Sequence, residues 1–398
     1  MRQLTKATHQ QTRAYNQQLV LKTIYDHAPT SRADVARRTG LTRTSVSELV
    51  DELLHGGLVE EVGRGRSSGG KAPILLRVDP DARQIIGLDV GERTIIGALV
   101  DLHGRVKRRV EWPLADPSAE EAVELLHRLV DELRCGADRP ILGVGVGTPG
   151  LVDSRTGTVR WAVNLDWHEL PLGPLLEQRH GLPVSIANDS HAAALAEYMF
   201  GSPRRSDSMV VVKVGQGIGA GIVLEGRLYQ GDRSAAGEIG HVGALSRSLP
   251  CRCGGVGCLE TVASVRAMLE RATHLASATP ASLLHDADGE ITPAAVADAA
   301  RRGDEVARAV VDEGGRELGA ALAVVLGVLD IRRFVLVGTA VAFGERWLAA
   351  VRDELMRRGF RRLTANAEIQ LGHGSQDIVA VGASALLMTR ELGLSLVR

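Results

Sequence analysis

Four potential metal ligands lie close together near the middle of the chain. Cys251, Cys253 and Cys258 fall within eight residues, and His241 precedes the first of them by ten residues. Cys-x-Cys followed by a third cysteine is typical of zinc sites, and an upstream histidine completes a tetrahedral set. The alternative is a disulfide plus a free thiol, but four cysteines in 398 residues and no signal peptide favour a reducing compartment. We therefore predict a structural zinc ion, because three thiolates and one imidazole leave no position for water.

Carboxylates suited to ligand binding lie on either side of this cluster and upstream of it. Glu238 and Glu260 bracket the four ligands, and Asp189 follows an apolar stretch at 184–187 that predicts a strand. An aspartate at the C-terminal end of a strand in an α/β sheet is well placed to contact a ligand, and it can act as a general base towards a hydroxyl. The alternative is that Asp189 caps the following helix, a role compatible with the first.

Glycine-rich segments interrupt the chain at three places, at 89–91, 147–150 and 215–226. Backbone N–H groups in such turns can approach phosphates closely, since glycine has no side chain in the way. A tight hairpin needs the same glycines, so the pattern alone does not identify a phosphate site.

Length and charge restrict the organisation of the chain. A chain of 398 residues predicts two or three folded units, and no apolar run is long enough to span a bilayer. Residues 1–80 carry 12 Lys+Arg against 8 Asp+Glu, and the remainder carries 35 against 40. A basic N-terminal unit on an acidic body is compatible with nucleic-acid binding by that unit.

The N-terminal 80 residues have the pattern of three helices followed by a hairpin. Apolar residues recur at helical spacing from Asn16 to His27, and Ser31 and Thr42 stand at the N-cap positions of two further helices. Two short helices joined by a turn that contains Gly40 are typical of a helix-turn-helix, and the hairpin after them has the place of a wing.

Polar and basic residues lie where such a unit would meet DNA, on the second helix of the pair and at the hairpin tip. The alternative is a solvated charged surface on a helical interaction domain. We predict DNA contacts from Arg43, Thr44, Ser45, Ser47, Arg64, Arg66 and Lys71.

Together, the N-terminal unit, the glycine-rich segments, GEIGH at 237–241 and the cysteine stretch resemble the ROK family of sugar-responsive repressors and sugar kinases. The resemblance runs from about Asn16 to about Leu392, and a winged helix in front is similar to the repressor branch. It implies an actin-like, two-lobed sugar-kinase fold, with His241 binding zinc through one ring nitrogen and turning the other to a sugar. It also implies a sugar site made of Gly150, Asn164, Asn188, Asp189, Glu238, His241 and Glu260.

Two positions depart from the pattern of the family's kinases. Glu92 stands where they have a second glycine, and its carboxylate would repel a nucleotide phosphate. Thr339 and Ala340 replace glycines near the expected adenosine position.

The sequence thus predicts an α/β protein with a winged helix-turn-helix domain at 1–80 and a sugar-binding body at 81–398. The body's lobes are expected at about 81–185 with the C-terminal helix, and at 186–378. We expect a cytoplasmic homodimer or homotetramer that binds palindromic operator DNA as a repressor and is released by a sugar. An activator with the same head is an alternative, and so is an ATP-dependent sugar kinase in which Asp189 is the general base.

Overall fold

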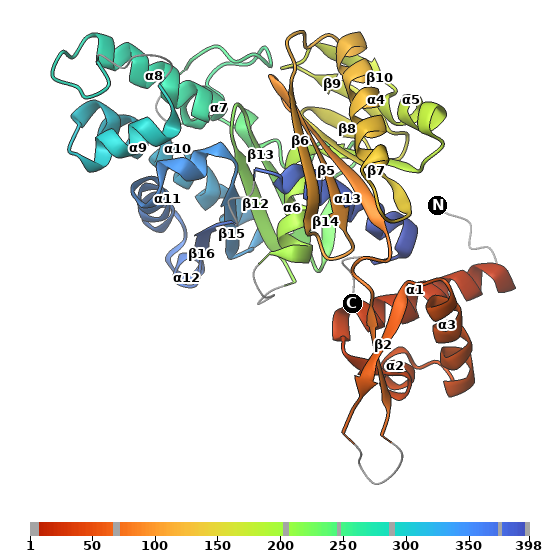
Figure 1. Cartoon of the computed structure of the whole chain (residues 1–398). Helices are drawn as coiled ribbons and strands as arrows, with labels where there is room; N and C mark the ends of the chain where they lie inside the picture. The colour runs from red at the N-terminus through yellow and green to blue at the C-terminus, as the bar shows by residue number, and fades with distance from the viewer. Residues whose placement is uncertain are drawn as a thin grey trace.

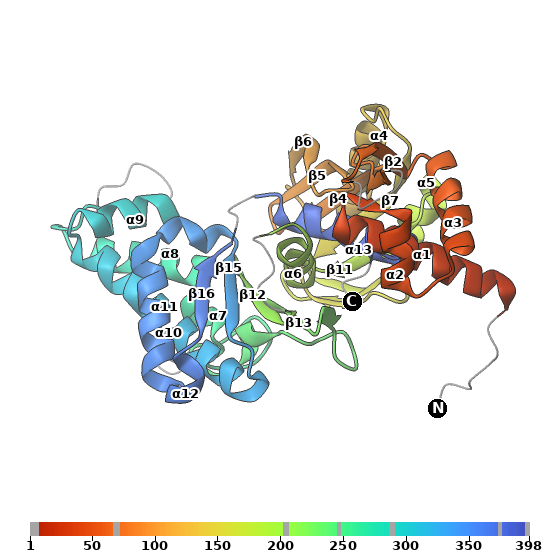
Figure 2. The same cartoon turned by 90° about the horizontal axis from the view of Figure 1, so that it is seen from below.

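The computed structural model places a small N-terminal head beneath a body of two lobes (Figure 1). Figure 2, seen from below, shows the head against the first lobe only, away from the second. The structure describes residues 8–66, 72–201, 207–244, 248–285, 291–372 and 376–394.

The head combines three helices with a three-stranded sheet in the order β1-β3-β2. The Ser31 and Thr42 hydroxyls accept hydrogen bonds from the backbone N–H groups three residues on, so both predicted N-caps are confirmed. Gly40 ends the helix between them at φ 70°, a conformation that favours glycine. The elements are α1 (His9–His27), β1 (Thr30–Ser31), α2 (Arg32–Thr39), α3 (Arg43–His55), β2 (Val59–Arg64) and β3 (Ile74–Val78).

Each lobe of the body contains a five-stranded sheet, and the two sheets repeat one topology. In each sheet the three strands that come first in the sequence are antiparallel, and the two later strands add in parallel beside the first of them. The first sheet has the order β11-β7-β4-β5-β6, and the second has the order β14-β13-β12-β15-β16. This repeat confirms the predicted two-lobed actin-like body.

The first lobe packs two helices on its sheet and adds a small antiparallel sheet, β8 to β10, above it. The strand β10 of this sheet begins three residues after Asn164. The elements are β4 (Gln84–Val90), β5 (Thr94–Asp101), β6 (Val106–Pro113), α4 (Ala119–Cys135), β7 (Ile141–Thr148), β8 (Leu151–Asp153), β9 (Thr158–Ala162), β10 (Trp167–Leu170), α5 (Leu172–His180) and β11 (Val184–Asn188).

The second lobe is largely helical outside its sheet. Its elements are β12 (Met209–Val214), β13 (Ile218–Leu224), β14 (Arg227–Tyr229), η1 (Ile239–His241), α7 (Glu260–Ala263), α8 (Val265–Ser277), α9 (Pro293–Arg301), α10 (Glu305–Leu329), β15 (Arg333–Val337), η2 (Thr339–Phe343), α11 (Glu345–Arg358), α12 (Arg361–Thr364) and β16 (Glu368–Leu371). Among the residues that the structure describes, no helix combines the length and apolar character needed to cross a membrane.

Two helices, α6 (Asp189–Phe200) and α13 (Ile378–Leu392), pack against each other at the centre of the body. Their contact is very close, since a Cβ on Gly382 would lie 1.8 Å from the Ala192 carbonyl oxygen. Gly145 of β7 meets the backbone of Ala383 in the same way. Any larger side chain at these glycines would force the helices apart.

The head shares one hydrophobic core with the first lobe and with the end of α13. Val20 and Ile24 of α1 belong to the same buried cluster as Leu102, Leu387 and Met388. The hydroxyl of a further α1 residue, Tyr25, donates a hydrogen bond to the Leu102 carbonyl at 3.1 Å. The head is therefore attached to the body by packing as well as by the chain.

Two buried histidines, His127 of α4 and His180 of α5, give the first lobe a pH-dependent stability. Their ring nitrogens lie 3.1 Å apart, and burial is the main cause that lowers both pKa values. The unfolded chain therefore binds protons that the folded protein excludes, and stability is lost as pH falls below about 6.5. For each histidine, we expect the free energy of unfolding to fall by at most about 1.4 kcal/mol per pH unit.

Urea unfolding at pH 7.5, 6.5 and 5.5 measures this dependence. His127→Leu should flatten it, whereas substitution of the exposed His274 by Gln should not. Equal slopes for the wild type and His127→Leu would contradict the assignment.

Candidate functional site

The four predicted metal ligands come together at the entrance to the cleft between the lobes. One ligand atom from each of His241, Cys251, Cys253 and Cys258 lies within 4.8 Å of the others. The Cys253 and Cys258 sulfurs are 3.7 Å apart, as are the Cys251 sulfur and the His241 Nδ1. A tetrahedral zinc ion with bonds of about 2.3 Å to sulfur holds two sulfur ligands about 3.8 Å apart, so this arrangement fits zinc.

The loop that carries the cysteines is shaped by its backbone. The Cys251 N–H donates to the Gly255 carbonyl at 2.9 Å, and Gly254 and Gly257 have φ values of 87° and 73°. Burial and the neighbouring sulfurs raise the pKa of the Cys258 thiol to about 12. Burial also raises the pKa of Cys251, whereas a backbone hydrogen bond at Gly255 lowers the pKa of Cys253. A bound divalent cation would favour the ionised form of all three thiols by coordinating it.

His241 connects the metal cluster to a large cavity. Its Nδ1 faces Cys251, whereas its Nε2 lies 3.9 Å from a carboxylate oxygen of Glu238. Both residues line a cavity of about 1090 Å³ that extends between the lobes. The same cavity is lined by every residue of the predicted sugar site, namely Gly150, Asn164, Asn188, Asp189, Glu238, His241 and Glu260.

Asn188 and Asp189 are positioned by the start of α6. The Asn188 side chain accepts hydrogen bonds from the N–H groups of Ser190 and His191 and donates to the Gly150 carbonyl at 3.0 Å. Asn188 is therefore the helix cap, and the alternative that Asp189 has this role is wrong. The Asp189 carboxylate instead lies on the cavity wall.

Lys213 of β12 is a component that the sequence analysis missed. Its Nζ lies 2.8 Å from a carboxylate oxygen of Asp189. Burial alone would raise the pKa of Asp189, but the Lys213 ammonium and a hydrogen bond from Ser190 outweigh it and lower that pKa. Burial raises the pKa of the nearby Asp89 to about 7, although Lys213 opposes this rise. Lys213, from the sheet of the second lobe, thus provides a positive charge near Asp189 and Asp89.

Glu238 and Glu260 are held close to each other and to the glycine turn after β12. The Ile218 N–H donates to the Glu260 carboxylate at 3.1 Å, and Glu260 is only 5% exposed. Burial, then repulsion by Asp189 and Glu260, raises the pKa of Glu238 to about 7. Two such carboxylates can accept hydrogen bonds from the hydroxyl groups of a polar, neutral ligand.

An aromatic side chain that the sequence analysis also missed completes the wall. Trp161 of β9 lines the cavity and is 40% exposed. A large flat apolar surface beside hydrogen-bonding carboxylates suits a ring-shaped polar molecule with apolar C–H faces.

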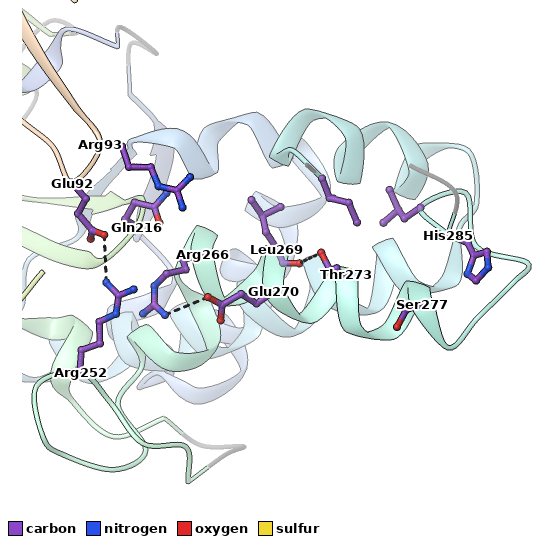
Figure 3. Close-up of a pocket in the computed structure, with 12 residues that line it drawn as sticks. Glu92, Arg93, Gln216, Arg252, Arg266, Leu269, Glu270, Thr273, Ser277 and His285 are labelled. Atoms are coloured by element: carbon purple, nitrogen blue, oxygen red, sulfur yellow. Dashed lines mark hydrogen bonds and ion pairs between the residues drawn. The ribbon is translucent and has the colours of Figure 1, made fainter. Parts of the chain in front are cut away.

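An ion pair next to the metal ligands joins the two lobes. A carboxylate oxygen of Glu92, in the turn after β4, lies 3.4 Å from the Arg252 guanidinium of the cysteine loop (Figure 3). The pair also lines a second, smaller cavity of about 500 Å³, whose other lining residues include Arg266, Leu269 and Thr273 of α8 (Figure 3). Thr339, the second predicted departure on this side, lines the larger cavity.

The basic residues of the head separate into paired and unpaired groups. Arg13, Arg32, Arg37 and Arg77 each form an ion pair with a carboxylate of the head. Within the described residues Arg43, Arg64 and Arg66 have no such partner, and all three are exposed. In the part of the chain that the structure describes, this unpaired positive charge lies at the start of α3 and on the β2–β3 hairpin, and Arg38 of α2, which contacts His27 and not a carboxylate, adds to it.

The remaining predicted DNA contacts differ in their availability. Thr44 is exposed and Ser47 half-buried on α3. The Ser45 hydroxyl lies 2.9 Å from that of Thr42, so the cap of α3 already engages it. Lys71 lies outside the described residues.

Two family models match successive parts of the chain. The ROK family model matches residues 85–390, and the MarR family model matches residues 12–67. The xylose repressor of Caldicellulosiruptor bescii is 32% identical over 391 residues, covering 96% of this chain and 98% of the repressor.

Two solved structures are also similar. The crystal structure of a ROK family transcriptional regulator, a homolog of the E. coli MLC protein, has a TM-score of 0.85 at 27% identity and covers 96% of this chain and 98% of its own. A ROK family glucokinase from Streptomyces griseus, in complex with glucose and AMPPNP, has a TM-score of 0.68 at 34% identity. It covers 76% of this chain and 98% of its own.

Proposed function

Because the chain belongs to the ROK family, we propose that it is a sugar-responsive transcriptional repressor. On this proposal the head binds operator DNA in the cytoplasm, and a sugar bound in the cleft releases it. The similarity to a xylose repressor over nearly the whole of both chains is the observation that carries the proposal. The unpaired arginines on α3 and the hairpin support DNA binding by the head.

The cleft supports the sugar response through both of its lobes. Asp89 and Asp189 come from the first lobe and the helix between the lobes, whereas Glu238 and Glu260 come from the second. A ligand that bridges these groups favours one separation of the lobes. Since α13 runs from the cleft into the core that the head shares, a change in that separation can alter the position of the head.

We assign Zn²⁺ to His241, Cys251, Cys253 and Cys258, where it would fix the orientation of His241. With Nδ1 on the ion, Nε2 carries a proton that it can donate to a sugar hydroxyl. Two heads on a palindromic operator require a homodimer or a larger symmetric assembly. Coupling is reciprocal, so operator DNA must weaken sugar affinity by the factor by which sugar weakens DNA affinity.

An ATP-dependent sugar kinase is the second candidate, favoured by Asp189 in the cleft and by the similar glucokinase. The charges on the nucleotide side oppose it. Lys213 binds the carboxylate that would accept the proton, and Glu92 places a negative charge beside the first glycine turn. Sugar-dependent ADP formation by the zinc-loaded protein tests this candidate.

The experiment that tests the proposal is recovery of bound fragments from sheared genomic DNA of the source organism. Fragments that share an inverted repeat, released by a sugar, would support a repressor. Diffuse retention that disappears with added salt would contradict sequence-specific binding.

Arg43→Ala should weaken binding to the recovered operator about 5- to 150-fold, since an arginine at a base edge contributes about 1–3 kcal/mol. Gel-shift titration at fixed salt measures this loss. Arg37→Ala is the matched control, because Arg37 is exposed on α2 but ion-paired with Asp34. If the two variants bound the operator with equal affinity, Arg43 would not be a DNA contact.

A further inference from the structure

The charges that line the large cavity are predominantly negative. Three cationic side chains, Arg93, Lys213 and Arg252, share this wall with six carboxylates. The carboxylates are those of Asp89, Glu92, Glu111, Asp189, Glu238 and Glu260. A ligand that carries a phosphate would enter against this excess unless a cation or a row of N–H groups were free to receive it.

The cations of the wall are already engaged or exposed. Lys213 binds Asp189 at 2.8 Å, and Arg252 lies 3.4 Å from Glu92 (Figure 3). Arg93 is exposed at the turn after β4, where solvent and salt weaken its attraction for an anion. A phosphate would therefore have to displace a carboxylate from Lys213 or Arg252 to gain a strong ion pair.

The glycine turns are also occupied by internal hydrogen bonds. The Gly91 N–H donates to the Thr94 carbonyl at 2.9 Å, and the Gly215 N–H donates to the Gly217 carbonyl at 2.9 Å. In the second turn the Ile218 N–H donates to the Glu260 carboxylate. These N–H groups, which could otherwise bind a phosphate, are satisfied by the protein itself.

We infer that the effector is an uncharged sugar without a phosphate group, and that the cleft excludes the phosphate ester of that sugar. The exclusion comes from the protein's own carboxylates and backbone carbonyls, which occupy Lys213, Arg252 and the N–H groups that a phosphate needs. This inference deepens the proposed repressor function and rests on it.

Binding and release experiments with the zinc-loaded full chain on operator DNA test the inference. The probes are xylose, glucose and N-acetylglucosamine, together with xylose 5-phosphate, glucose 6-phosphate and N-acetylglucosamine 6-phosphate. Calorimetry gives the affinities, and a gel shift reports DNA release. We expect one free sugar to bind and release DNA, with its ester at least 100-fold weaker.

The possible outcomes separate the inference from the function on which it rests. An ester that binds as tightly as its sugar, or more tightly, would overturn the inference and leave a sugar-responsive repressor in place. Failure of all six probes to bind or to release DNA would count against the sugar response itself, and the inference would fall with it.

A variant tests the cause of the exclusion. Glu92→Gln removes the carboxylate from Arg252, so the ratio of ester to sugar affinity should rise at least fivefold. Glu132→Gln is the matched control, because Glu132 also forms an ion pair with an arginine, Arg108 at 2.8 Å, but lines neither cavity. An equal ratio in the Glu92 variant and the wild type would show that paired cations do not cause the exclusion.

Discussion

A Cys251→Ser variant is expected to lose the zinc that we assign to the cluster and to bind the effector about 10- to 100-fold more weakly, although Cys251 lies on the side of His241 away from Glu238. The Cys251 sulfur lies 3.7 Å from the His241 Nδ1, on the side of the ring away from Glu238. Without an ion at Nδ1, the ring loses both its fixed orientation and the fixed proton on Nε2. A hydrogen bond to the sugar is then lost or must be reorganised at a cost in free energy.

Metal content per chain and calorimetric sugar affinity measure the two losses together. Cys135→Ser provides the matched control, since this exposed cysteine lies outside the cluster. Operator binding without sugar should survive in both variants, because the core of the head does not include the cysteine loop. Unchanged sugar affinity in a zinc-free Cys251→Ser protein would separate the metal from the ligand site.

Asp189→Asn is expected to give a repressor that stays on its operator at sugar concentrations that release the wild type. The amide keeps the shape of the side chain but loses the charge that strengthens a hydrogen bond from a sugar hydroxyl. Such charge-assisted bonds are worth about 1.5–3 kcal/mol, which predicts a roughly 10- to 100-fold loss of sugar affinity. DNA release and calorimetry measure it.

The same substitution should also lower the free energy of unfolding, because Lys213 loses the carboxylate 2.8 Å away. Removing one partner of a fully buried ion pair costs about 3–5 kcal/mol. We expect about 1–3 kcal/mol here, since both side chains are partly exposed and Asp89 remains nearby.

Asp189→Asn combined with Lys213→Met separates the two effects. In urea unfolding, the double variant should regain the free energy of unfolding that Asp189→Asn loses, but it should not regain the sugar response. The matched control is Asp298→Asn, which changes an exposed aspartate of α9. If Asp189→Asn alone responds to sugar like the wild type, Asp189 takes no part in sugar binding.

The sequence predicted those features that depend on neighbouring residues. The caps at Ser31 and Thr42 follow from residue type and helical spacing, and the grouping of Cys251, Cys253 and Cys258 follows from one short loop. Residues of a site that come from distant segments could be predicted in part, but only from the family resemblance. The cavity brings together residues from 89 to 379, which no local pattern relates.

Pairings across the fold could not be predicted in this way. Lys213 alternates with valines in a strand, and nothing in that pattern indicates that its ammonium reaches Asp189. Glu92 was predicted to repel phosphate, but its partner Arg252 is 160 residues further along the chain. The side chains of Asn188 and Asp189 both suit a helix cap, and only the backbone geometry selects the first.

The core that joins the head to the first lobe limits how such regulators can be recombined. Val20 and Ile24 in the head pack with Leu102 of the first lobe and with Leu387 and Met388, which lie more than 360 residues later in the sequence. A chimera joined near residue 80 would therefore inherit half of one core from each parent. An engineered or natural exchange of DNA specificity would succeed most readily when the last turns of α13 are exchanged with the head. The alternative is to change only the outward-facing residues of α3 and the hairpin. The head, the first lobe and α13 then keep the core that they share.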